Sequence, residues 1–140
     1  MNDRTFLQAF EAATIPAEAW NHRAHIRMAF LYLRDYPFND AISRIRAGIQ
    51  HFNQAHQKPE TPTSGYHETL TVGWARVIAG ALQTGSPIKD FETFIAATPQ
   101  LLNKNLLWRY YSTARILSPQ AKATFVEPDI QALPPIPSLV

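Results

Sequence analysis

Hydrophobic residues recur every three or four positions along this chain, and the strict alternation that is typical of strands is almost absent. Such a period predicts amphipathic helices, each with one face turned toward a shared core. Pro59, Pro62 and Gly65 predict a loop over residues 58–65. The pattern predicts helices at residues 3–13, 16–36, 39–52, 66–82, 90–97, 101–117 (interrupted) and 118–125.

The segment 66–82 differs from the other predicted helices because it is apolar nearly all round. Between Thr69 and Leu82 its only charged residue is Arg76. A helix of this composition is enclosed by other helices. We therefore predict an all-α fold, a single-domain globular bundle of about five to seven helices around this central helix.

The prolines after Glu127 predict a change of structure at the end of the chain. Pro128, Pro134, Pro135 and Pro137 are incompatible with a regular helix. We expect a helical domain over residues 1–127 and an extended Pro-rich tail over 128–140, on the surface or against a neighbour.

Composition and charge narrow the possible functions. With 140 residues, 46% of them hydrophobic, the chain can form one well-buried domain. The lack of cysteine excludes disulfides, thiolate nucleophiles and iron–sulfur clusters. A net charge of +2 from dispersed basic residues gives a weak footprint for nucleic acid, so we expect no nucleic-acid partner. The charged N-terminus and the absence of a long apolar segment predict a cytoplasmic protein without a membrane partner.

The first polar cluster is His22-Arg23-Ala24-His25, within the predicted helix 16–36. On a helical wheel, Glu18, His22 and His25 fall on the side opposite to the arginines of this helix. Two histidines three residues apart can share a metal ion, and Glu18 could be a third ligand or orient an imidazole. Alternatively, the pair lies in the core and bonds to backbone carbonyls or water.

The second cluster is Tyr66-His67-Glu68-Thr69, at the start of the apolar helix. The helix dipole there disfavours a charged imidazole, so His67 should be neutral, as a metal ligand or an electrophilic catalyst requires. Glu68 lies beside apolar surface, which predicts a raised pKa and suits a general base. Tyr66, His67 and Glu68 are therefore candidate catalytic residues. Alternatively, Glu68 caps a helix that starts at 64 or 65.

Aromatic and polar residues nearby are candidates for contacts with a small molecule. Thr71 and Trp74 share a helix face with His67. Tyr110 and Tyr111 form an aromatic patch whose hydroxyls could orient a ligand, although aromatics at helical spacing also occur in cores.

Three functional hypotheses follow. The first is an enzyme for a small molecule that holds a transition metal (Fe, Zn, Cu or Ni) through His22, His25 and His67, with Glu68 as ligand or base, for hydrolytic or non-haem-iron chemistry. The second is a metal-free isomerase or lyase in which His67 and Glu68 move protons. The third is a non-enzymatic module that binds a small ligand or a partner. In this third case the polar cluster orients the ligand or only ties two helices together. The site hypothesis places the two clusters in one pocket, and a homodimer is compatible with the low charge and the tail.

Four motifs in order give the chain a resemblance to a known family. They are His22-x-x-His25, Tyr66-His-Glu-Thr-x-Thr71, Tyr110-Tyr-Ser112 and Phe125-Val-x-Pro-Asp129. With these, the chain resembles a family of small, uncharacterised bacterial proteins over nearly its whole length. The resemblance implies a single-domain protein and brings no activity or site residue with it.

Overall fold

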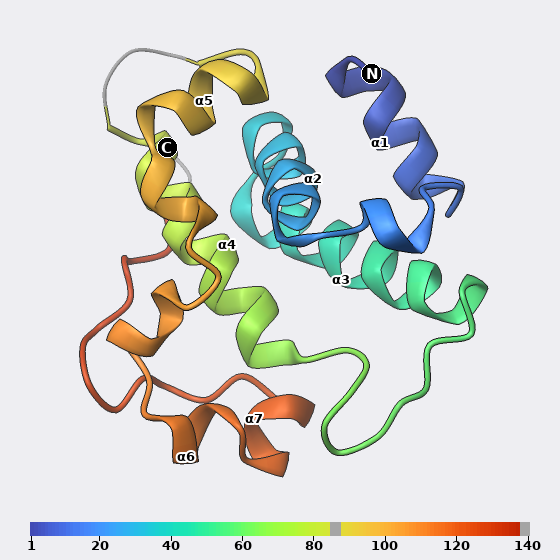
Figure 1. Cartoon of the computed structure of the whole chain (residues 1–140). Coiled ribbons are helices and arrows are strands. Elements are labelled where there is room, and N and C mark those ends of the chain that lie inside the picture. Colours follow the sequence, from blue (N-terminus) through green and yellow to red (C-terminus); the bar gives the residue numbers. More distant parts are fainter. Residues whose placement is uncertain (85–87, 138–140) are drawn as a thin grey trace.

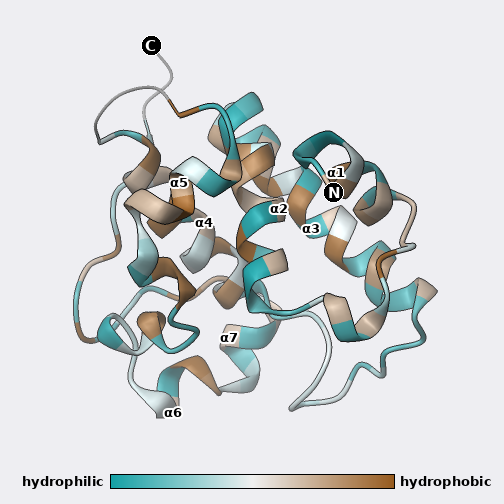
Figure 2. Ribbon diagram, turned by 45° about the horizontal axis from the view of Figure 1, so that its top comes forward, coloured by the Kyte–Doolittle hydropathy of each residue, from teal (hydrophilic) through white to brown (hydrophobic). Residues whose placement is uncertain are grey.

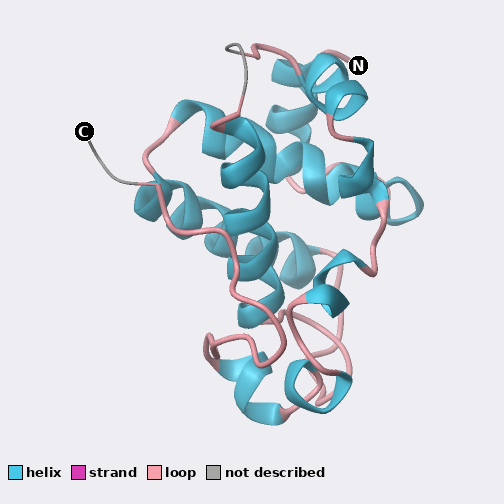
Figure 3. Cartoon of the chain, turned by 90° about the vertical axis from the view of Figure 1, so that its left-hand side faces the viewer, coloured by secondary structure: helices cyan, strands magenta, loops and turns pink. Residues whose placement is uncertain are grey.

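The computed structural model describes residues 1–84 and 88–137, and every regular element in that part of the chain is a helix (Figure 3). The predicted all-α, single-domain fold is confirmed. The α-helices are α1 (Asp3–Glu11), α2 (His22–Asp35), α3 (Phe38–Ala55), α4 (Glu68–Leu82), α5 (Phe91–Ala97), α6 (Thr113–Ile116) and α7 (Pro119–Ala123). Three short 3₁₀ turns add η1 (Ala17–Ala19), η2 (Pro99–Leu102) and η3 (Leu106–Arg109).

The apolar helix α4 lies at the centre, as its composition predicts. It packs against α2, α3, α7 and η3 and runs through the middle of the molecule in Figure 1. A Cβ atom on Gly73 would lie 3.3 Å from Leu107, and one on Gly80 would lie 3.0 Å from Pro134. The two glycines therefore let two later segments of the chain approach α4 closely.

Large aromatic side chains fill the core between the outer helices. Phe30 and Phe94 stack with ring centroids 4.6 Å apart, and Phe10 stacks on Phe52 at 6.0 Å. Figure 2 shows the complementary pattern, with hydrophilic residues along the loop between α3 and α4. Among the described residues, no helix is both long and apolar enough to cross a bilayer.

The segment after α7 contains no helix as far as residue 137. It folds back on the domain: Leu133 is 5% exposed, and the carbonyl of Pro134 accepts a 2.8 Å hydrogen bond from Nε of Arg76. This hydrogen bond attaches the segment to the protein's own central helix α4, which contains Arg76. The last three residues of the predicted tail, 138–140, lie outside the described part of the chain.

Three predicted helix starts are corrected. The predicted helix 16–36 is divided, because the side chain of Asn21 caps α2 by accepting from the amide of Ala24 at 3.0 Å, and residues 17–19 form the separate turn η1. Helix α3 starts at Phe38, one residue before the predicted start at residue 39. Helix α4 starts at Glu68, with His67 as its N-cap.

Candidate functional site

The cap at Asn21 places His22 and His25 in the first turns of α2. Nε2 of His22 donates to the carbonyl of Leu101 at 2.9 Å, and Nδ1 of His25 donates to the carbonyl of Asn21 at 2.7 Å. Each imidazole is thereby fixed through one nitrogen. Nδ1 of His22 and Nε2 of His25 have no partner among the described residues, and since no fully buried side-chain nitrogen there lacks one, both are accessible.

Two indole rings pack against these histidines. Trp20 lies against His25 with ring centroids 4.0 Å apart, and Trp74 meets His22 edge-on at 4.9 Å. Burial lowers the pKa of His25, so the ring is neutral at physiological pH and its Nε2 is a hydrogen-bond acceptor. The indole N–H groups of Trp20 and Trp74 have no partner among the described residues and are accessible as well.

These four rings line an apolar pocket of about 360 Å³ between α2, α3 and α4, which we call the histidine pocket. Thr71 lines it from α4, and Lys104, an exposed residue between η2 and η3, brings one cation to it. Most of the remaining wall is aliphatic. A mainly apolar cavity of this size with a few polar groups has the composition of a small-molecule site.

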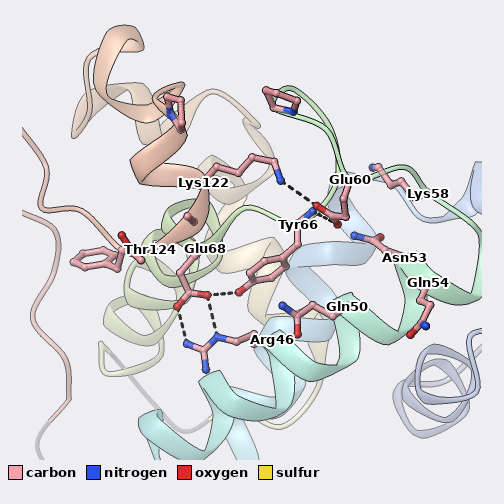
Figure 4. A pocket seen from close by; sticks show the side chains of 14 residues that line it. Arg46, Gln50, Asn53, Gln54, Lys58, Glu60, Tyr66, Glu68, Lys122 and Thr124 are labelled. Atoms are coloured by element: carbon pink, nitrogen blue, oxygen red, sulfur yellow. Dashed lines mark hydrogen bonds and ion pairs between the residues drawn. The ribbon is translucent and has the colours of Figure 1, made fainter.

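The second cluster does not reach the histidine pocket. Glu68 forms a bidentate ion pair with Arg46 of α3, with Nη2 at 2.7 Å and Nε at 2.9 Å, and it accepts a 2.5 Å hydrogen bond from the hydroxyl of Tyr66 (Figure 4). The bonds from Arg46 lower the pKa of Glu68, which corrects the raised pKa expected from its apolar neighbours. Glu68 is therefore an engaged carboxylate, and burial raises the pKa of Tyr66 so that its hydroxyl stays protonated.

His67 also has a structural partner at each ring nitrogen. As the N-cap of α4, its Nδ1 accepts from the amide of Leu70 at 3.0 Å, while Nε2 donates to the carbonyl of Ile116 at 2.8 Å. Burial lowers its pKa, which favours the expected neutral form, although the expectation rested on the helix dipole. Neither nitrogen is free for a metal or for proton transfer, so the roles expected for His67 do not fit this geometry.

The structure therefore brings together four of the predicted site residues and separates the others. His22, His25, Thr71 and Trp74 share the histidine pocket. Tyr66 and Glu68 line a second pocket, and His67 lines a third. The expected convergence of both clusters is wrong, and within residues 1–84 and 88–137 no three His, Asp or Glu side chains are placed to hold one metal ion.

The two tyrosines predicted to contact a substrate belong to other surroundings. Tyr111 is 1% exposed, and its hydroxyl donates to the carbonyl of Val126 at 2.7 Å, so it is a core residue. Tyr110 is half-buried, and its carbonyl accepts from the amide of Ile130 at 3.0 Å. Neither lines a pocket with the histidines.

Sequence reasoning missed Arg46, Trp20 and Asn21. Arg46 follows the apolar position Ile45, and its partner is 22 residues away, so nothing local indicates the ion pair. Asn21 had a usable signal, because asparagine directly before a polar-apolar repeat is a common N-cap. Recognising it would have removed Glu18 from the histidine helix.

Comparison of the chain with protein-family models, curated proteins and solved structures finds no match. Fold and pocket define the class on their own: a single-domain, all-helical protein with an apolar pocket edged by two histidines. The resemblance to small bacterial proteins based on the four motifs stays a prediction.

Proposed function

We propose that this protein binds a small, mainly apolar molecule with hydrogen-bonding groups in the histidine pocket. The observation that carries this is the pair His22 and His25. Each ring is fixed by a backbone carbonyl and has one unpaired acceptor nitrogen at the wall of an apolar cavity. Fixed acceptors in apolar surroundings favour a ligand that supplies donors, because a ligand without them would leave the acceptors desolvated and unpaired.

Shape and chemistry of the lining further define the ligand. The aromatic and aliphatic lining suits a flat apolar body, and the indole N–H groups of Trp20 and Trp74 are donors for an acceptor on the same ligand. Lys104 adds a cation that favours a neutral or anionic molecule over a cationic one. A phenol-like or indole-like compound satisfies these requirements.

Metal binding by the histidine pair is the second candidate function. Histidines that ligate metals usually donate their other ring N–H to a carbonyl or carboxylate, and both His22 and His25 do so. In this version a divalent transition metal (Fe, Zn, Cu or Ni) would be held by the two histidines, with ligand atoms or water completing its shell. The expected chemistry is then hydrolytic or of the non-haem-iron type, as in the first hypothesis. His67 is not a ligand in this version, and Glu68 is neither a ligand nor a base.

The three tryptophans allow a direct test by NMR. We would titrate the protein with p-cresol and with toluene, which lacks the hydroxyl donor, and follow the indole N–H signals. Binding in the histidine pocket moves the signals of Trp20 and Trp74 and leaves Trp108, whose N–H is bonded to Asn105, unchanged. We expect p-cresol to bind roughly two- to tenfold more tightly than toluene.

Substitution of His25 tests whether its imidazole accepts the hydrogen bond from the ligand's hydroxyl. His25→Leu should remove the preference for p-cresol while toluene still binds. Equal affinity of the two probes for the unsubstituted protein, or a uniform response of all three indoles, would refute the proposal.

For the metal candidate, Ni²⁺ should broaden the signals of Trp20 and Trp74, and this broadening should be lost in His22→Ala. Unaltered spectra with excess Ni²⁺ would remove that candidate.

A further inference from the structure

A second pocket of about 930 Å³, lined mostly by polar and charged residues, lies between α3, the loop after it and α7 (Figure 4). We call it the amide groove, after Gln50 and Asn53, which extend into it from α3. It is separate from the histidine pocket, with which it shares no lining residue. Its walls carry several charged groups, and those without an ion-pair partner decide which ligands could bind there.

Most of these charges already have a partner. Arg46 is paired with Glu68. Both carboxylate oxygens of Glu60 accept hydrogen bonds, Oε1 from the backbone amide of Tyr66 at 2.9 Å and Oε2 from the ammonium of Lys122 at 3.0 Å. Each of the two ion pairs is neutral as a unit. Lys58 is the remaining charged side chain of the lining, and its ammonium has no ion pair among the described residues, so the groove has a net charge of +1.

Asn53 gives the groove its most unusual feature. The residue is only 7% exposed, yet its side-chain amide makes no hydrogen bond with any described residue. No fully buried side-chain N or O atom there lacks a partner, so the amide atoms are accessible, and the residue lines the groove. The amide therefore keeps a donor and an acceptor that no described protein group uses and that face the groove.

The neighbouring amide, that of the exposed residue Gln50, adds further hydrogen-bonding groups to the groove. Gln50 lies three residues before Asn53, on the same side of α3, and its side chain has no hydrogen bond within the described residues either. Figure 4 shows both amides extending from α3 into the space bounded by Tyr66 and Glu60. Two adjacent amides offer donors and acceptors to one bound molecule.

We propose that the amide groove is a binding site for a small polar anion, with a carboxylate or phosphate group beside Lys58 and hydrogen bonds to the amides of Asn53 and Gln50. The single unpaired cation selects for negative charge. The ion pairs Arg46–Glu68 and Lys122–Glu60 position the walls and leave their own charges satisfied. The site is independent of the histidine pocket, so either can exist without the other.

Side-chain amide signals in ¹⁵N NMR spectra give the direct measurement. We would titrate the protein at constant ionic strength with inorganic phosphate and, separately, with succinate, up to about 10 mM. We expect a saturable shift of the NH₂ signals of Asn53 and Gln50 with at least one probe, and the stronger of the two identifies the anion class. No saturable shift with either probe overturns the proposal.

Charge reversal adds a matched comparison. Lys58→Glu should weaken binding roughly tenfold, whereas Lys104→Glu, which changes the same charge at the histidine pocket, should leave it unaltered. Equal weakening by both variants would mean that only the overall charge of the protein attracts the anion, which overturns a site in the groove.

The stability of Asn53→Leu separates a ligand-binding role from a structural one. If the amide serves a ligand, the leucine variant should lose anion binding and unfold at the same or a higher urea concentration than the original protein. A clearly lower urea midpoint would show that Asn53 supports the fold, and the proposal would fail.

Discussion

His67 offers the sharpest test of how α4 is held in place. Its imidazole connects two elements, since Nδ1 caps the first turn of α4 at Leu70 and Nε2 anchors that turn to the carbonyl of Ile116, a residue with 0% exposure. We therefore expect His67→Ala to destabilise the protein strongly. His67→Asn should have a smaller effect, because asparagine is a good N-cap but is too short to reach Ile116.

The two bonds give separate magnitudes. Losing the cap costs about 1 kcal/mol of unfolding free energy. Leaving the buried carbonyl of Ile116 without a donor costs about 1–3 kcal/mol more. His67→Ala should therefore lose about 2–4 kcal/mol in total, which for a domain of this size lowers Tm by roughly 6–12 °C. His67→Asn should retain about 1 kcal/mol of that.

Urea unfolding at neutral pH, followed by far-UV circular dichroism, measures these differences. His51→Ala is the matched control, because His51 is an exposed histidine of α3. The order of stability should be control, then His67→Asn, then His67→Ala. If His67→Ala unfolds within about 0.5 kcal/mol of the control, the capping role is refuted and a ligand-binding or catalytic role for His67 becomes tenable again.

Three further predictions concern stability. Gly48→Ala should lower the unfolding free energy by about 1–2 kcal/mol in urea melts despite the better helix propensity of alanine, because its Cβ would lie 2.5 Å from the buried ring of Phe10; equal or greater stability would contradict this. Tyr111→Phe should cost about 1–2 kcal/mol in the same assay by leaving the carbonyl of Val126 unpaired, and an unchanged midpoint would contradict the bond. Burial lowers the pKa of His25 below its usual 6.5, so the unfolding free energy should be highest above pH 6.5 and fall as the pH drops through the lower folded-state pKa. Urea melts across this pH range should show a weaker dependence for His25→Gln, and an identical profile would contradict the neutral buried ring.

The fold was predictable because its determinants are local. The apolar composition of 66–82 indicates a central helix. The helices predicted from residues 90 and 118 start one residue later in the structure, with Asp90 and Ser118 as their N-caps. The error at the second helix is local as well. The hydrophobic period continues across Asn21, but its side chain bonds to the amide of Ala24 and begins a new helix there.

The candidate site was less predictable because its determinants are distant in sequence. The carbonyls of Leu101 and Ile116 fix His22 and His67 from 79 and 49 residues away. No pattern near either histidine distinguishes the ring with a free nitrogen from the ring without one. A sequence can thus identify candidate histidines, but their hydrogen-bond partners in the fold decide which of them can bind a ligand.

Helix α3 illustrates the same limit for a whole surface. Its apolar positions Ile45 and Ile49 line the histidine pocket, while the polar residues Arg46, Gln50 and Asn53 line the amide groove. In sequence, a polar stripe beside an apolar one is typical of a helix with one face in solvent. Here the loop between α3 and α4 returns over that stripe, so that Glu60 and Tyr66 enclose it. Two adjacent stripes of one helix thereby face two pockets with different lining residues, mostly aliphatic and aromatic in one and mostly polar and charged in the other. This makes α3 the element where substitutions can alter one proposed site while the other serves as the internal control.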